Sequence, residues 1–115
     1  MRVVDKGRQE LGRSLLERAA YHFSRAIEID STNPYAYFYL GLTRKQANKC
    51  GQASDLFARA SDLFGEDRAW AAESLAYRGE CLEKLGRTEE AKKTYEQALE
   101  VDRGNLRAQN GLSRN

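Results

Sequence analysis

Two stretches of the chain repeat apolar side chains with the period of an amphipathic helix. In residues 53–64 small and large apolar side chains recur three and four positions apart: Ala53, Leu56, Phe57, Ala60, Leu63 and Phe64. In residues 91–99 the same spacing joins Ala91, Thr94, Tyr95, Ala98 and Leu99. This spacing places one stripe along a helix, so both stretches are predicted to be helices that bury one face.

Residues that favour helix starts divide the chain further. Asn33 followed by Pro34 is typical of a helix start, with the asparagine as cap and the proline at the first helical position. Thr88 followed by Glu89 and Glu90 is a second start, because acidic side chains interact favourably with the positive end of the helix dipole. The chain is therefore predicted to consist of helices joined by short turns.

Two frames of residues occur three times each along the chain. The first is Tyr37-x-x-Leu40-Gly41, with related segments Val3-x-x-Lys6-Gly7 and Leu75-x-x-Arg78-Gly79. The second is Ala-x-x-x-aromatic-x-x-Ala: Ala19/Phe23/Ala26, Ala53/Phe57/Ala60 and Ala91/Tyr95/Ala98. Both frames advance by 34 residues from the first copy to the second and by 38 residues from the second to the third. An internal period of roughly 34 residues is typical of stacked helix pairs.

The glycines of this pattern have two predicted roles. Gly7, Gly41 and Gly79 lie inside predicted helices, where glycine costs about 1 kcal/mol against alanine. We expect them where a neighbouring helix passes too close for a side chain, with its alanines as the other half of the contact. Gly51 and Gly86 are predicted to end helices in the left-handed conformation.

The second interval is four residues longer than the first, and the extra residues lie between positions 60 and 75. One helical turn takes about 3.6 residues, so an added turn keeps the apolar face nearly in phase. The segment EDRAWAAESLAYRG is thus predicted to be one helix with a longer start, and Trp70 to lie on the added turn. Trp70 has two readings, which are cover for the join between the second and third repeats and an anchor for a partner.

These frames resemble the tetratricopeptide repeat, a helix pair of roughly 34 residues. The resemblance covers nearly the whole chain and implies one all-α domain over 1–115, a right-handed superhelical stack of antiparallel helix pairs with about seven helices. The repeats are expected at about 1–33, 34–67 and 68–105, with the third the most faithful and the first the weakest. A capping helix at about 105–113 would cover the last pair with Leu106, Ala108 and Leu112.

In this family the first helix of each repeat lines a concave groove. The positions carried over by the resemblance are, repeat by repeat, Val4, Arg8 and Leu11; Tyr35, Phe38, Leu42 and Lys45; and Glu73, Ala76, Glu80 and Glu83. An apolar middle beside an acidic third repeat predicts a peptide with an apolar anchor and basic residues. Phe38 has the alternative reading of packing between repeats. Relatives that clamp the C-terminal carboxylate of chaperones use Lys, Asn and Arg at these positions, of which only Arg8 is matched here, and this argues against such a ligand.

Composition narrows the class of partner. The chain has 115 residues and a net charge of +2 with both signs interspersed, so no basic block indicates a nucleic-acid partner. No apolar run is long enough to cross a bilayer, and no membrane partner is expected. The first residues, MRVVDKGRQELG, carry charges where a signal peptide is apolar, so the chain, if complete, is expected in the cytoplasm.

The sequence offers little material for catalysis or metal binding. The single His22 and the two cysteines, Cys50 and Cys81, form no metal-ligand spacing and no disulfide framework. We expect no metal, no cofactor and buried free thiols, with a disulfide as the lesser alternative. Glu80 and Glu83 are expected on a solvated groove face, since no nucleophile and base accompany them, and the chain is predicted not to be an enzyme.

These observations favour a non-catalytic module that binds a protein or peptide in its groove, as a scaffold, adaptor or co-chaperone-like protein. One alternative is a structural or oligomerisation segment of a larger protein. Another is a small protein like a secretion chaperone. Val3, Val4 and Leu11 of the incomplete first helix are open to a second copy, and weak or moderate self-association is predicted. An RNA-binding helical repeat is a third alternative, which the balanced charge disfavours.

Overall fold

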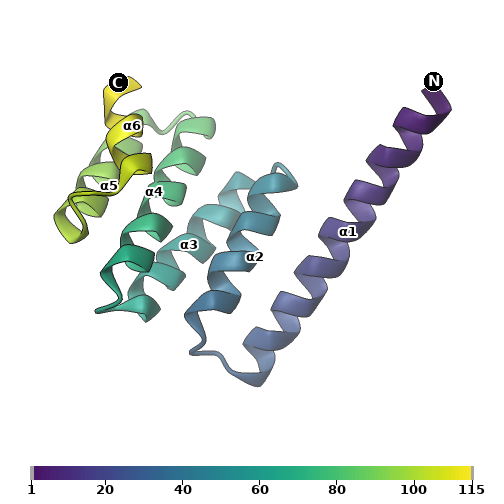
Figure 1. Cartoon of the computed structure of the whole chain (residues 1–115), viewed down its shortest axis with the longest axis horizontal. Helices are drawn as coiled ribbons and strands as arrows, with labels where there is room; N and C mark the ends of the chain where they lie inside the picture. Colours follow the sequence, from purple (N-terminus) through teal and green to yellow (C-terminus); the bar gives the residue numbers. More distant parts are fainter. Residues whose placement is uncertain (1, 115) are drawn as a thin grey trace.

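The computed structural model describes residues 2–114, and it describes side chains for residues 12, 13 and 15–114. This part of the chain forms six helices: α1 (Arg2–Ile29), α2 (Pro34–Gln46), α3 (Cys50–Phe64), α4 (Arg68–Lys84), α5 (Thr88–Val101) and α6 (Leu106–Arg114). Consecutive helices run in opposite directions and stack along the chain (Figure 1). The predicted all-α stack of helix pairs is confirmed, with six described helices where about seven were expected.

The missing helix belongs to the first repeat, where the sequence predicts a helix pair. The structure has instead one continuous helix of 28 residues, α1. In both inner helix pairs the turn within the repeat contains a residue with positive φ, Asn48 or Gly86. The position one repeat before Asn48 is Ser14, a residue type with no preference for left-handed backbone. At about 1.5 Å per residue α1 is roughly 42 Å long, and its N-terminal half extends beyond the end of α2 (Figure 1).

The two inner helix pairs, α2–α3 and α4–α5, are built on the repeated frames. Phe57 on α3 and Tyr95 on α5 are fully buried. A β-carbon on Gly41 would lie 2.8 Å from Cε1 of Phe57, so the glycine is needed for close approach of the helices. The close approach is as predicted, but the group that it admits is the aromatic ring and not an alanine.

The extra four residues form one turn at the start of α4, as predicted. Helix α4 has 17 residues where its counterpart α2 has 13. Trp70 lies in that added turn, and its ring stacks on Phe64 of α3 with the centroids 5.4 Å apart. The reading of Trp70 as cover between the second and third repeats agrees with this packing.

The predicted helix starts are confirmed at Asn33 and Thr88, whereas α3, α4 and α5 begin without a hydrogen bond from a capping side chain. The side-chain oxygen of Asn33 accepts a hydrogen bond from the backbone N–H of Tyr35 (3.0 Å), and Thr88 is the first residue of α5. Gly86 is left-handed (φ 78°), as predicted. Gly51 is not, because it lies inside α3, and the left-handed residue of that turn is Asn48 (φ 63°). Asparagine tolerates this region better than other side chains.

The core has two parts. One, between α2, α3 and α4, holds Phe38, Cys50, Ala53, Phe57, Ala60, Phe64, Ala71 and Cys81. The other, between α4, α5 and α6, holds Ala72, Ala76, Leu82, Ala91, Tyr95, Ala98 and Ala108. Both cysteines are free thiols. Burial, together with a hydrogen bond to Cys50, raises the pKa of Cys81 to about 12, so this thiol is protonated at neutral pH.

Candidate functional site

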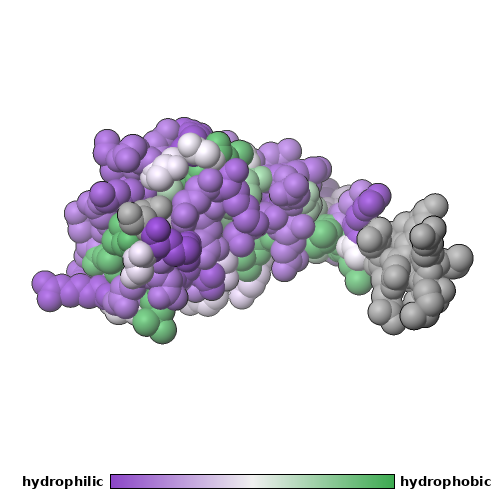
Figure 2. All heavy atoms as spheres, turned by 90° about the horizontal axis from the view of Figure 1, so that it is seen from above, coloured by the Kyte–Doolittle hydropathy of each residue, from purple (hydrophilic) through white to green (hydrophobic). Residues whose placement is uncertain are grey.

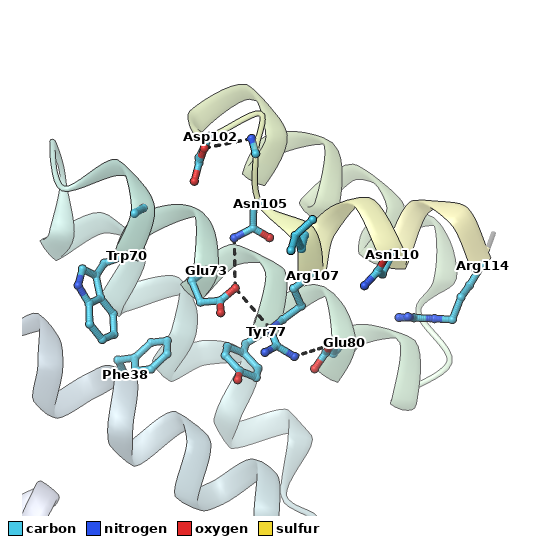
Figure 3. Close-up of a pocket in the computed structure, with 13 residues that line it drawn as sticks. Phe38, Trp70, Glu73, Tyr77, Glu80, Asp102, Asn105, Arg107, Asn110 and Arg114 are labelled. Carbon is cyan, nitrogen blue, oxygen red and sulfur yellow. Dashed lines mark hydrogen bonds and ion pairs between the residues drawn. The ribbon is translucent and has the colours of Figure 1, made fainter.

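A pocket of about 770 Å³ opens between α2, α4 and α6 (Figure 3). Helix α4 forms its floor with Trp70, Glu73, Tyr77 and Glu80, which are spaced three and four residues apart and so share one face of the helix. Phe38 of α2 closes the end next to Trp70, while α6 forms the opposite wall. The pocket therefore joins an aromatic end to a charged end.

Arg107 of α6 reaches across the charged end of the pocket. Its Nη1 lies 3.1 Å from Oε2 of Glu80, and its Nε lies 3.4 Å from Oε1 of Glu73. Its guanidinium carbon lies 3.9 Å from the ring centroid of Tyr77, within cation–π range. Desolvation alone would lower the pKa of Arg107, but the hydrogen bond to Glu80 and the nearby negative charges leave that pKa raised, so the side chain remains a cation.

Asn105 fixes the start of α6 against this face. Its Oδ1 accepts a hydrogen bond from the backbone N–H of Ala108 (2.8 Å), which caps the helix. Its Nδ2 donates to Oε1 of Glu73 (3.1 Å), the carboxylate oxygen that also faces Arg107. One buried asparagine thus ties the position of α6 to the acidic side of α4 (Figure 3).

The aromatic end is a cluster of rings from three helices. Phe38 meets Trp70 edge to face with the centroids 5.2 Å apart, and Tyr35 meets Trp70 in the same way at 5.1 Å. Phe38 is 4% exposed, whereas Tyr35 is 42% exposed. A partner would therefore reach Tyr35 and the edge of Trp70 before it reached Phe38.

A second charged group lies at the C-terminal end of α4. Glu83 accepts hydrogen bonds from the hydroxyl of Tyr95 and from Nη2 of Arg114, the latter at 2.9 Å. Burial, followed by the hydrogen bond and charge of Glu83, raises the pKa of Tyr95 above its usual range. This network holds the far end of α6 to α4 and α5.

The structure brings some of the predicted groove residues together and separates others. Glu73, Glu80 and Phe38 line one pocket, and Nζ of Lys45 lies 3.3 Å from Oε1 of Glu80. Leu42 is partly buried against the core between α2, α3 and α4.

Other predicted positions differ or lie outside the description. Ala76 is wrong as a contact residue: it is completely buried, because α5 and α6 cover that side of α4. Leu106 is 70% exposed and does not cover the last pair, unlike Ala108, which is buried. The side chains that lie outside those described include the predicted contact residues Val3, Val4, Arg8 and Leu11.

Sequence reasoning missed Arg107 and placed Asn105 only at the start of the capping helix, although a signal for the role of both was present. One further repeat interval counted from Glu73 reaches Arg107, so the arginine occupies the groove position of a further first helix. Asn105 lies two repeats after Asn33, at the distance that the two repeat intervals give when added together. Both asparagines cap a helix. The chain thus continues its repeat pattern into α6.

The described residues include neither a metal-binding cluster nor a helix that could span a membrane. No group of three or more His, Cys, Asp or Glu side chains in this part of the chain is placed to hold a metal ion. None of the described helices combines the length and apolar character that a membrane span requires. Most of the surface in Figure 2 is hydrophilic, with apolar side chains scattered between polar ones.

Comparison with known proteins agrees with the repeat pattern. The tetratricopeptide repeat family matches residues 72–105. No curated protein matches the chain. The resemblance inferred from the repeated frames is confirmed for the third repeat, which is the most faithful copy.

Solved structures extend the likeness over nearly all of the fold. The second TPR domain of the human RPAP3 protein, in complex with HSP70 peptide SGPTIEEVD, has a TM-score of 0.78 and 26% identity over 96% of this chain and 88% of that one. The first TPR of Spaghetti (RPAP3), bound to HSP90 peptide SRMEEVD, has a TM-score of 0.77 and 24% identity over 96% of this chain and 84% of that one. The first TPR domain of human RPAP3 gives the same values. The fold is that of tetratricopeptide domains.

Proposed function

We propose that this chain, which has the tetratricopeptide fold, is a non-catalytic module that binds a peptide segment of another protein along the face formed by α2, α4 and α6. It would serve as an adaptor or co-chaperone-like protein. The observation that carries the proposal is the pocket between these helices, which has the rings of Phe38 and Trp70 at one end, beside the exposed Tyr35, and charged groups at the other. A few polar groups beside apolar surface are typical of a site that orients a ligand.

The charges of the pocket favour a peptide unlike those of the structural neighbours. Two of those neighbours hold acidic peptides that end in EEVD. Among the described residues, three cations in or beside the pocket are already paired with carboxylates: Arg107 with Glu73 and Glu80, Lys45 with Glu80, and Arg114 with Glu83. An acidic peptide would have to compete with these carboxylates for all three cations. We therefore propose a ligand with an apolar anchor for Tyr35 and Trp70 and with basic side chains beyond it.

Trp70 makes this proposal directly measurable, because it is the only tryptophan of the chain and lines the pocket. We would screen the protein against an array of random peptides and follow the hits by the fluorescence of Trp70. Binding peptides should change the emission of Trp70. Tyr35→Ala and Glu80→Gln should weaken their binding by about tenfold or more, since the first removes apolar contact and the second removes charge.

Glu28→Gln is the matched control for Glu80→Gln, because Glu28 is an exposed carboxylate on α1 that pairs with Arg25. It should bind every hit as the wild type does. Peptides that bind Tyr35→Ala and Glu80→Gln as tightly as the wild type would show that the binding site lies elsewhere. An array without hits, together with a mobility shift of random RNA at low salt, would replace the proposal by nucleic-acid binding.

A second candidate function rests on α1. Leu15 (54% exposed) and Ile29 (81% exposed) are large apolar side chains four helical turns apart, so they lie on one face of this helix. We propose that this face supports weak association between two copies of the chain or with another segment of a longer protein. Light scattering over a range of concentrations tests it: the mass should rise with concentration for the wild type and stay monomeric for Leu15→Ser with Ile29→Ser.

A further inference from the structure

Three side chains of α4 surround one cation. Glu73, Tyr77 and Glu80 lie on consecutive turns, so the phenol ring stands between two carboxylates. The guanidinium of Arg107 lies on the ring and is flanked by both acids, at 3.4 Å from Glu73 and 3.1 Å from Glu80. We call these three α4 residues the arginine cage. Figure 3 shows Arg107 entering it from the side of α6.

The shape of the cage suits arginine better than any other charged side chain. A guanidinium is flat, so it can lie on an aromatic face and donate hydrogen bonds within its own plane to groups on both sides. A lysine ammonium offers a point charge without that plane. A carboxylate would meet two like charges. The cage is therefore selective for arginine by charge and by geometry.

Arg107 fills the cage imperfectly. Its Nε is buried but has no hydrogen bond of good geometry, although the carboxylate of Glu73 lies 3.4 Å away. The backbone of Arg107 is held in place, because Asn105 caps the helix start and Ala108 is fully buried beside it. An arginine on a separate segment is free of this restraint and can align its donors with both carboxylates.

The side chain of Arg107 can leave while α6 stays in place. It is 32% exposed toward the open pocket, so a change of rotamer takes it into solvent. The helix itself remains attached through Ala108 and through the ion pair between Arg114 and Glu83. Exchange of one arginine for another at the cage therefore needs no unfolding of α6.

We propose that the arginine cage is the specificity pocket for an arginine of the bound peptide, and that Arg107 is a built-in competitor that the peptide displaces. This proposal rests on the proposed function and names the chemistry of its ligand. The competitor is on the same chain and is therefore always present. The apparent affinity for the peptide is the intrinsic affinity multiplied by the fraction of time for which Arg107 leaves the cage empty. Arg107 thus sets a threshold for binding.

The experiment compares two probes on three forms of the full chain. The probes are blocked pentapeptides, acetyl-Gly-Leu-Arg-Leu-Gly-amide and the same peptide with citrulline, the neutral isostere, in place of arginine. The proteins are the wild type, Arg107→Gln and the control Arg25→Gln, which removes one positive charge from the exposed surface of α1. Calorimetry gives the six dissociation constants, and circular dichroism checks that each variant is helical.

Arg107→Gln should bind the arginine peptide about tenfold more tightly than the wild type does, as expected when a competitor that fills the cage most of the time is removed. The citrulline peptide should bind all three proteins equally weakly, and Arg25→Gln should match the wild type. Adding Glu80→Gln to Arg107→Gln should abolish the preference for arginine over citrulline.

Equal affinity of Arg107→Gln for the two peptides would overturn the inference. If array peptides still bound through Tyr35 and Glu80, the proposed function would stand while the cage failed; if none bound, both would fail. Should Arg107→Gln not fold, the side-chain ¹⁵Nε signal of Arg107 in the wild type decides. It must move when the arginine peptide is added, and an unmoved signal at saturation refutes displacement.

Discussion

The phenol ring of Tyr95 fills the space that a β-carbon on Gly79 would need. Cε1 of Tyr95 would lie 2.5 Å from such a carbon, and a β-carbon on Gly111 of α6 would clash with the same ring. Helices α4, α5 and α6 therefore meet at one aromatic ring, which contacts a glycine of α4 and a glycine of α6. The contact explains why a residue that weakens helices recurs inside them.

Gly79→Ala should lower the free energy of unfolding by about 2 kcal/mol, because the clash with a fully buried ring exceeds the gain in helix propensity. Urea denaturation followed by circular dichroism measures it. Gly51→Ala is the matched control: a β-carbon there meets nothing within 4 Å, and Gly51 also lies in a helix. Its stability should be unchanged or slightly raised. A neutral Gly79→Ala would show that the ring can move aside.

Alkaline pH should destabilise the protein through Tyr95. Its pKa is raised in the folded state, so above about pH 10 the unfolded chain releases a proton that the folded chain retains. The free energy of unfolding is then expected to fall by about 1.4 kcal/mol per pH unit from this group, and to keep its full value below pH 10.

Tyr95→Phe should lose this part of the alkaline slope in urea denaturations between pH 9 and 11. Tyr21→Phe should retain it, since Tyr21 is 62% exposed on α1. An identical slope for the wild type and Tyr95→Phe would show that the hydroxyl ionises equally easily in both states.

Trp70→Ala should cost about 3 kcal/mol of stability, because it removes a ring that packs on Phe64 and Phe38 and leaves a cavity between the second and third repeats. Thermal and urea denaturation both report this loss. Leu106→Ala, which trims an exposed apolar side chain, should change stability by less than about 0.5 kcal/mol. Equal effects of the two changes would mean that the added turn of α4 frays.

The turn between α2 and α3 should improve with glycine. Asn48 has a positive φ of 63°, so Asn48→Ala is expected to destabilise by about 1 kcal/mol, whereas Asn48→Gly should stabilise by about 0.5 kcal/mol. The reciprocal change Gly86→Asn, at φ 78°, should destabilise by a similar small amount. Urea denaturation midpoints measure both changes. Asn48→Gly and Gly86→Asn should change the stability in opposite directions, and changes in the same direction would contradict the assignment of left-handed backbone to these two positions.

The features that the sequence predicted are those that depend on neighbours within one repeat. The glycines and the aromatic residues recur at fixed offsets, so the close approach of the helices in both inner pairs was predicted, although an alanine was expected where the ring of Phe57 or Tyr95 meets the glycine. The added turn followed from counting residues, since only a whole turn keeps the apolar face in place. The left-handed residue of the turn between α2 and α3 was wrongly assigned to Gly51, because glycine is the residue type that most readily adopts this conformation. The second repeat interval, counted back from Gly86, leads to the correct residue, Asn48.

The features that escaped prediction depend on relations between repeats. Residues 2–29 form one helix and not a pair, and the position that matches the turn residues Asn48 and Gly86 is Ser14, a difference that the periodicity does not record. Ala76 was assigned to the groove by its position, but its burial is decided by α5 and α6. Pairing of Arg107 with Glu73 and Glu80 joins residues that lie about a repeat apart, so the acidic groove wall looked free in the sequence.

The added turn of α4 also limits how such a chain can be lengthened. Inserting four residues advances a helix by slightly more than one turn, so every later side chain keeps nearly the same bearing toward the core. Inserting two residues would rotate the rest of the helix by about half a turn and expose its apolar face. Loop-free insertions that preserve the fold are therefore expected in steps of a whole turn, which gives engineers a spacing rule for fusing a new helix pair onto this domain.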